Sequence, residues 1–256
     1  MPRSQATWDR VRQQVHAAYV IAKKDAVIYY LKPPVISFGI IFPLFFYLAF
    51  AAGRNVSAQS MVPGIMAMAL FFTASAVGPL VTPWERQART YERLVTSPAS
   101  LWAILIGDAA AGALFGILLS LIPLAIGCFL AGSSIAKPMH LCGSIVLGAA
   151  AFSALGVLMA ARASDTPSEI MMLSNLVRLP LIFISGVFIP LAEMPEWGQR
   201  LAPLSPLSYA ADLIRIGMGG TGYFPVILDV SALLAFAAGL LFLAHVLHRR
   251  AQLKAG

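Results

Sequence analysis

The strongest constraint in this sequence is a set of six apolar runs, each long enough to cross a lipid bilayer as a helix. A hydrocarbon core about 30 Å thick needs roughly 20 apolar residues per helix. The six runs cover residues 34–52, 61–83, 101–130, 140–161, 170–190 and 226–247. They are rich in Ala, Leu, Ile, Gly and Met and lack the alternation of a membrane β-barrel. We therefore predict an all-α membrane protein whose single transmembrane domain occupies residues 1–256.

The composition excludes the soluble alternatives. Hydrophobic residues make up 59% of the chain and charged residues 11%, whereas charged residues make up about 25% of an average soluble domain. So few charges cannot cover the surface of a water-soluble globule, and a disordered chain contains far less Leu, Ile, Val and Phe. The net charge is +7. Because the basic residues lie between the apolar runs, we interpret this charge as a signal of membrane topology rather than of nucleic-acid binding.

The basic residues predict the orientation. With a cytoplasmic N-terminus, thirteen of the 18 Lys and Arg residues fall in the inside segments, and the outside segments hold only Arg54, Lys137, Arg200 and Arg215. Such an excess is the positive-inside signal of membrane proteins. We predict that both termini are cytoplasmic, in the plasma membrane or the bacterial inner membrane.

Residues 4–32, before the first span, have the pattern of an amphipathic helix. Their apolar side chains recur every three or four residues, and the basic and amide side chains lie largely elsewhere around the helix. The pattern fits a helix lying in the membrane interface, and it fits a helix docked on its own bundle equally well. The members of the apolar stripe are Trp8, Val11, Val15, Ala18, Tyr19, Ala22, Ala26 and Tyr29.

The segment 84–98 joins the second and third spans and is too charged to enter lipid. Glu85 and Arg89 are spaced as neighbours on a helix, and Tyr91, Leu94 and Val95 add an apolar edge. A short cytoplasmic surface helix is the sharper prediction, and a solvated charged loop explains the same residues.

The segment 191–225 is the longest of the outside connections and is unusually apolar. Apolar surface of this extent is costly in water, and backbone at membrane depth must pack in protein or line a cavity. We therefore expect a hairpin of two short helices that dips back into the outer leaflet before the sixth span.

These two segments carry a resemblance to a known family. The motif Arg89-Thr90-Tyr91-Glu92-Arg93-Leu94, with Ser97-Pro98 and Gly107 after it, and the motif Phe188-Ile189-Pro190 with Ser205-Pro206-Leu207-Ser208-Tyr209 resemble the membrane subunit of type-2 ABC exporters. That group includes the daunorubicin-resistance, nodulation-factor and polysaccharide export permeases. Gly107-Asp108 departs from the Gly-Lys that the family often has, which reverses a charge.

The resemblance implies partners and site residues. It implies a homodimer or a pseudo-dimer of this permease, docked on two copies of a cytoplasmic ATPase subunit. The loop that seats in the ATPase would contain Glu85, Arg86, Arg89, Thr90, Tyr91, Glu92, Arg93 and Leu94. The external gate would contain Pro190, Pro195, Trp197, Pro203, Pro206, Tyr209, Asp212 and Arg215.

The chain itself lacks the groups that enzymes use. No phosphate-binding loop of the form Gly-x-x-x-x-Gly-Lys-Ser/Thr occurs, and the four histidines are scattered rather than clustered with carboxylates. We expect no cofactor, no metal and no catalytic residue in this chain, and we assign ATP and Mg to the partner ATPase.

Two ionisable residues lie inside predicted spans, where charges are costly. Asp108 lies in the third span and Arg178 in the fifth, both roughly 10–12 Å from the cytoplasmic end at 1.5 Å per residue. Their similar depth allows a buried pair within one subunit or across the dimer. The alternative is that each side chain reaches water or a headgroup separately.

The sequence as a whole predicts an ATP-driven exporter permease for an amphipathic or hydrophobic substrate, a drug-like molecule or a lipid. A lipid-linked glycan exporter of the same family is the alternative within this class. Outside it stand an ion-coupled secondary transporter, which favours internal repeats and midplane ion ligands, and a membrane scaffold without transport activity.

Overall fold

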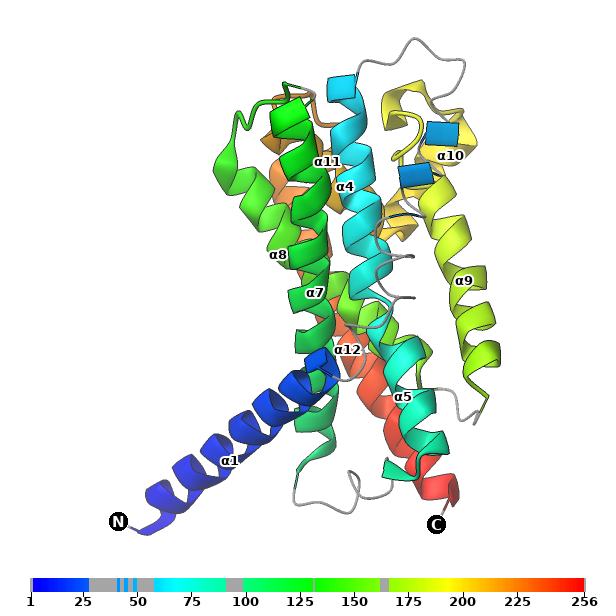
Figure 1. Cartoon of the computed structure of the whole chain (residues 1–256). Helices are drawn as coiled ribbons and strands as arrows, with labels where there is room; N and C mark the ends of the chain where they lie inside the picture. The colour runs from blue at the N-terminus through cyan, green and yellow to red at the C-terminus, as the bar shows by residue number, and fades with distance from the viewer. Residues whose placement is uncertain are drawn as a thin grey trace.

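The structure is a computed structural model that describes residues 2–27, 41, 44–45, 48–49, 58–90, 99–130, 132–161 and 166–255. Within these ranges it is helical and contains no strand (Figure 1). The elements are α1 (Pro2–Asp25), α4 (Ala58–Ala74), α5 (Val77–Gln87), α7 (Leu101–Leu130), α8 (Pro138–Met159), α9 (Pro167–Phe183), η3 (Leu191–Glu193), α10 (Glu196–Leu201), η4 (Ala202–Leu204), α11 (Pro206–Gly217) and α12 (Val226–Ala255).

Four described helices are long and apolar enough to cross a membrane. They cover Ser60–Gln87, Leu101–Phe129, Pro138–Met159 and Val226–Ala251, and they coincide with four of the six predicted runs. The predicted span 34–52 lies mostly outside the described residues. The predicted span 170–190 is occupied by α9, which ends at Phe183 because the chain turns through Gly186, at φ +76°.

The core of the bundle lies where α4, α8 and α11 meet. Phe71 and Phe152 are fully buried there, and their rings make an edge-to-face contact with centroids 5.0 Å apart. The short helix α11 packs against α8, and the Ser144 hydroxyl donates to the Ala210 carbonyl at 2.7 Å. Nearly all of α11 is buried. It is therefore packed inside the end of the bundle that lies opposite the two termini, and its depth in the membrane stays a prediction.

The second span is broken at Ser75 and Ala76, between α4 and α5. Pro79 has no N–H to donate to the Ser75 carbonyl four residues earlier. The Arg178 guanidinium, on α9, donates to that carbonyl instead. Gly156 on α8 lies so close that a Cβ added to it would be 2.6 Å from the same oxygen. The break is thus held by contacts from two neighbouring helices.

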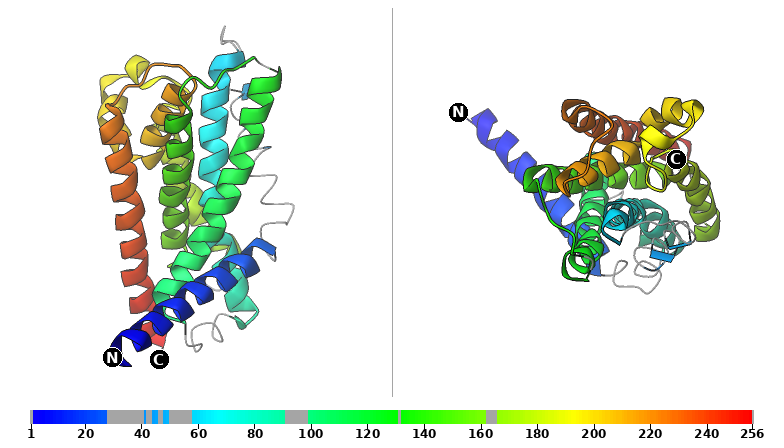
Figure 2. Two further views of the ribbon diagram at one scale, coloured as in Figure 1. Left: turned by 90° about the vertical axis from the view of Figure 1, so that its left-hand side faces the viewer. Right: turned by 90° about the horizontal axis from the view of Figure 1, so that it is seen from above.

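The two ends of the chain lie at the same end of the bundle, and α10, α11 and the start of α12 lie at the other (Figure 1). Figure 2 shows that α1 crosses the lower part of α7 and projects away from the bundle. Ile21 is buried, whereas Val11, Val15 and Tyr19 are exposed. The last turns of α1 therefore pack on the bundle, and the Gln14 side chain accepts the Ser100 N–H at 2.7 Å. Half of the described apolar stripe faces outward.

Candidate functional site at the junction of α1, α5 and α7

The segment predicted to couple to an ATPase begins inside the bundle. Helix α5 continues the broken span through Gln87 and places Glu85 in a buried position, 4% exposed. Arg89 has φ 53°, so it is not the next turn of the same helix, and the expected helical neighbourhood of Glu85 and Arg89 does not form. Arg89 and Thr90 are exposed. Residues Tyr91, Glu92, Arg93 and Leu94 lie outside the described part of the chain.

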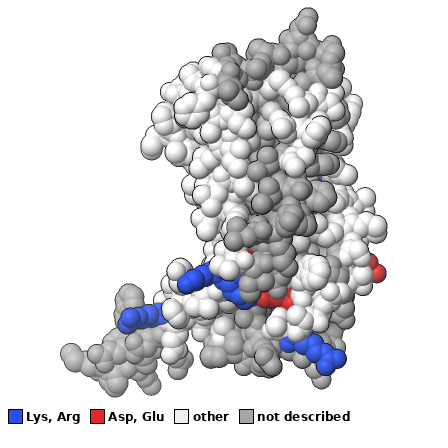
Figure 3. Space-filling view, in the orientation of Figure 1, with Lys and Arg blue, Asp and Glu red and all other residues white. Residues whose placement is uncertain are grey.

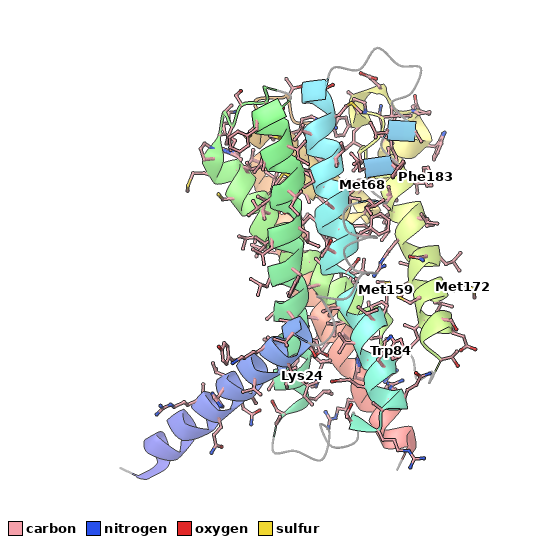
Figure 4. All side chains as sticks on the ribbon, viewed as in Figure 1. Lys24, Met68, Trp84, Met159, Met172 and Phe183 are labelled. Atoms are coloured by element: carbon pink, nitrogen blue, oxygen red, sulfur yellow. The ribbon has the colours of Figure 1, made fainter. Side chains whose placement is uncertain are left out.

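Glu85 faces a cluster of ionisable side chains from three helices. Lys24, near the end of α1, forms an ion pair with Glu85 and lies 3.1 Å from the Asp25 carboxylate, Nζ to Oδ1. Asp108, on α7, lies within hydrogen-bonding reach of Asp25. Figure 4 shows Lys24 where α1 reaches the bundle, and in Figure 3 blue and red side chains adjoin in the lower part of the face.

The cluster depends on a close approach of α1 to α7 at Gly107. A Cβ at this position would lie 2.8 Å from the Ala18 carbonyl oxygen and 2.8 Å from the Ile21 Cβ. These distances are shorter than real side-chain contacts, so only glycine fits without a shift of α1. The absence of a side chain at Gly107 brings Asp108, its neighbour, next to Asp25.

Burial and charge act in opposite directions on the two α1 residues. Burial lowers the pKa of Lys24, but the carboxylates of Asp25 and Glu85 outweigh it, and the net pKa is raised. Burial raises the pKa of Asp25, which the Lys24 ammonium only partly offsets. Lys24 is therefore a firmly protonated cation, and Asp25 takes up a proton more readily than an exposed aspartate does.

The expected pairing of Asp108 with Arg178 is not the arrangement found within one chain. Asp108 faces Asp25 at the α1 crossing, and Arg178 donates to the Ser75 carbonyl at the break of the second span. Both side chains are buried, Asp108 at 6% and Arg178 at 3% exposure. The reason for the difference is that α1 supplies a cation close to Asp108, while Pro79 leaves a carbonyl in need of a donor near Arg178. A contact between two copies stays a prediction.

The residues predicted to form an external gate are spread through the segment from η3 to α11. The prolines stand at or near helix starts: Pro190 before η3, Pro195 before α10, Pro203 in η4 and Pro206 at the start of α11. The Tyr209 hydroxyl donates to the Pro203 carbonyl at 3.1 Å. Trp197, on α10, is 64% exposed.

Asp212 and Arg215 tie α11 to the chain on either side of it. The Asp212 carboxylate accepts the backbone N–H groups of Tyr223 and Phe224 at 2.8–2.9 Å. Arg215 donates to the Gly186 carbonyl at 3.1 Å. The segment is therefore a hydrogen-bonded cap over the end of the bundle opposite the two termini. A gating role for these residues stays a prediction.

Sequence reasoning missed the partners Lys24 and Asp25. In the sequence, Lys24 contributes only to the positive-inside signal, and no motif predicts a role for Asp25. A usable signal existed: Asp25 is an acidic residue followed directly by Ala26-Val27-Ile28, and a carboxylate at such a position needs a partner if it is buried. No pattern in the sequence selects Asp108 as that neighbour.

Comparison with known families gives a match over most of the chain. The model of the ABC-2 type transporter family matches residues 18–219, a range that contains the ionisable cluster, the segment 84–98 and the cap from η3 to α11.

Several curated proteins are similar to the chain along most of their length. "Inner membrane transport permease YadH" of Escherichia coli (strain K12) is 26% identical over 210 residues, which cover 80% of this chain and 82% of that protein. "Nodulation protein J" of Sinorhizobium fredii is 27% identical over 255 residues, 95% of this chain and 93% of that protein. "Daunorubicin resistance ABC transporter permease protein DrrB1" of Streptomyces coeruleorubidus is 27% identical over 210 residues, 79% and 71% of the two chains.

Proposed function

The chain belongs to the ABC-2 type transporter family, and from this premise we propose that it is the transmembrane permease of an exporter driven by separate ATPase subunits. The observation that carries the proposal is the family match over residues 18–219, together with four described helices long enough to span a membrane. In this proposal, the permease forms the substrate pathway as a dimer, and two copies of an ATPase bind ATP and Mg at the cytoplasmic face.

The proposed topology has six spans and two cytoplasmic termini. Residues 34–52 and α9 supply the two spans beyond the four that length and composition identify. The location of both termini at one end of the bundle supports an even number of crossings, and the positive-inside excess supports the cytoplasmic side. In the same proposal, the exposed stripe of α1 lies in the inner-leaflet interface.

The proposed route of coupling runs through Glu85. The segment 84–98 would contact the ATPase through its exposed residues, of which Arg89 and Thr90 are described. Glu85 would not touch the ATPase, because its side chain is buried against Lys24. A displacement of the loop would instead pull on α1 through the Lys24–Glu85 ion pair and on the bundle through α5.

The proposed substrate is amphipathic or hydrophobic, a drug-like molecule or a lipid. The printed name of one relative refers to daunorubicin resistance. A second relative, "Probable multidrug ABC transporter permease YbhR" of Escherichia coli (strain K12), is 26% identical over 156 residues, which cover 60% of this chain and 42% of that protein. The similarity to nodulation protein J keeps a lipid-linked glycan as the second candidate.

The test is purification of the tagged full chain from its native membrane, followed by reconstitution in proteoliposomes. We expect a Walker-motif ATPase to co-purify in about equimolar amount and its activity to respond to drug-like amphiphiles. Arg89→Glu should reduce that response. The matched control is Arg200→Glu, because Arg200 is an exposed arginine of α10, at the opposite end of the bundle. Absence of a co-purifying ATPase would overturn the proposal.

A further inference from the structure

The junction of α1, α5 and α7 contains three described carboxyl groups, those of Asp25, Glu85 and Asp108, around one described cation, Lys24. Lys24 is the one described cation that faces the cluster, and Glu85 is its ion-pair partner across helices. Asp25 and Asp108 then lie against each other, 0% and 6% exposed. Two ionised carboxylates in contact and out of water repel strongly, and a shared proton is the usual resolution.

Unsatisfied hydrogen-bond acceptors of the two carboxyls also support a shared proton. The Lys24 ammonium lies 3.1 Å from Oδ1 of Asp25, but Oδ2 of Asp25 and Oδ1 of Asp108 accept no hydrogen bond from a described N–H or O–H group. Buried polar atoms normally have a partner. A proton on one of the two carboxyls would turn it into a donor toward the other, and would satisfy one oxygen of each residue at once.

We propose that Asp25 and Asp108 share one proton when α1 is docked on α7, which makes the docking of α1 proton-dependent. The close approach at Gly107 creates the site, because it holds the two carboxyls together. When α1 moves away, the two carboxyls separate, each regains water, and the shared proton leaves to solvent. The shared proton adds to the proposed transport function a dependence of the position of α1 on pH.

The direction in which pH changes the docking of α1 follows from the direction of the pKa shift of Asp25. Burial raises the pKa of Asp25 in the docked state above its ordinary value of 3.8. Its contribution to docking is therefore fully present below that value and is lost as the pH rises through the raised pKa. Docking weakens with rising pH, by at most about tenfold per pH unit for one linked proton.

The direct test detects the protonated carboxyl by infrared spectroscopy on the full-length permease in lipid nanodiscs, with ¹³C-labelled aspartate to separate Asp from Glu. The measurement uses an Asp229→Asn background, because Asp229 is another fully buried carboxyl that has no hydrogen-bond donor among the described residues. We expect the carbonyl stretch of a protonated aspartate at neutral pH, and its loss in both Asp108→Asn and Asp25→Asn. A band that survives both substitutions, or no band in the parent, would overturn the proposal.

The second test follows docking itself through the labelling rate of a cysteine at Ala22, whose side chain packs on the apolar cluster at this junction. The reference is a cysteine at Val20, which is 48% exposed, and both are placed in a chain without Cys128 and Cys142. The ratio of the two rates should rise with pH in the parent and stay flat in Asp108→Asn, whose amide mimics the protonated acid. An equal slope in both proteins would refute the proton linkage. Neither measurement requires an ATPase, so a negative result for the shared proton can be distinguished from a failure of the proposed transport function.

Discussion

Arg178 donates a hydrogen bond to the carbonyl of Ser75, the oxygen that Pro79 leaves without a helical partner. The contact joins α9 to the point where the second span breaks into α4 and α5. An arginine inside a predicted span is expensive, and here it has a defined structural use. Pro79 leaves a carbonyl that needs a donor, and the buried guanidinium of Arg178 supplies it.

The first prediction tests this relationship. Arg178→Met should lower the free energy of unfolding by about 1–3 kcal/mol, because it removes the donor to a buried carbonyl. Pro79→Ala in the same chain should recover part of the loss, since the new N–H can bond to Ser75 as in a regular helix. Thermal unfolding in lipid–detergent micelles measures both.

The control is Leu179→Met, at the neighbouring position on α9, where the side chain is 36% exposed; it should leave stability within about 0.5 kcal/mol. If Arg178→Met lowers the free energy of unfolding by the same amount with and without Pro79, the hydrogen bond to the Ser75 carbonyl is not what makes Arg178 stabilising.

The second prediction concerns the crossing of α1 over α7. Gly107→Ala should displace α1, because the new Cβ would lie 2.8 Å from Ala18 and Ile21 atoms. Labelling of a cysteine at Ala22 should become faster. Gly143→Ala is the matched control, since that helical glycine has no heavy atom within 4 Å of an added Cβ and both substitutions gain helix propensity of up to about 1 kcal/mol. Equal behaviour of the two variants would contradict the close approach.

The third prediction concerns the Lys24–Glu85 ion pair. Lys24→Met should destabilise the junction more than the double change Lys24→Met with Glu85→Gln, because the single change leaves a buried carboxylate without its cation. Losses for a fully buried pair are about 3–5 kcal/mol, and the Lys24 side chain is 28% exposed, so a smaller loss is expected. A double-mutant cycle by thermal unfolding isolates the pair.

The pH dependence of this pair has a defined sign. The pKa of Lys24 is raised above 10.5, so at alkaline pH the contribution of the ion pair is lost only as the pH rises through the raised pKa. At acid pH the pair is lost when Glu85 takes up a proton, because it requires an ionised carboxylate. A decline of the double-mutant coupling energy between pH 6 and 8 would show that another group titrates in the pair.

The fourth prediction concerns the cap over the opposite end. Asp212→Ala should loosen the connection to α12, because the backbone N–H groups of Tyr223 and Phe224 lose their acceptor. A cost of about 1.5–3 kcal/mol is expected for hydrogen bonds to a charged group. Limited proteolysis between Met218 and Pro225 measures the loosening. Arg200→Ala, which breaks an ion pair whose side chains are 81% and 88% exposed, should have almost no effect.

The sequence predicted the helices well where the apolar runs are long and uninterrupted. The run 101–130 is α7 to the residue, and 140–161 begins two residues after the start of α8. Where prolines and glycines interrupt the pattern the prediction was coarser. The second span breaks at Ser75, and α9 ends at Phe183 rather than at the end of its apolar run.

The site shows the same division. Glu85 and Asp108 were singled out from the sequence, but as a residue of an exposed loop and as a partner for Arg178. Their actual neighbours, Lys24 and Asp25, lie 61 and 83 positions away along the chain. Helical periodicity relates residues three or four positions apart and carries no information about such distances.

The sequence by itself determined that this chain is a membrane protein, that it is helical and that it is a member of the ABC-2 type transporter family. These properties follow from the amount and local order of apolar residues and from motifs that are contiguous in the chain. Only the tertiary structure decided which charges meet. The glycine-permitted crossing of α1 over α7 and the proline-induced break of the second span bring together groups from different helices, and the need of buried charges and carbonyls for partners selects the pairs.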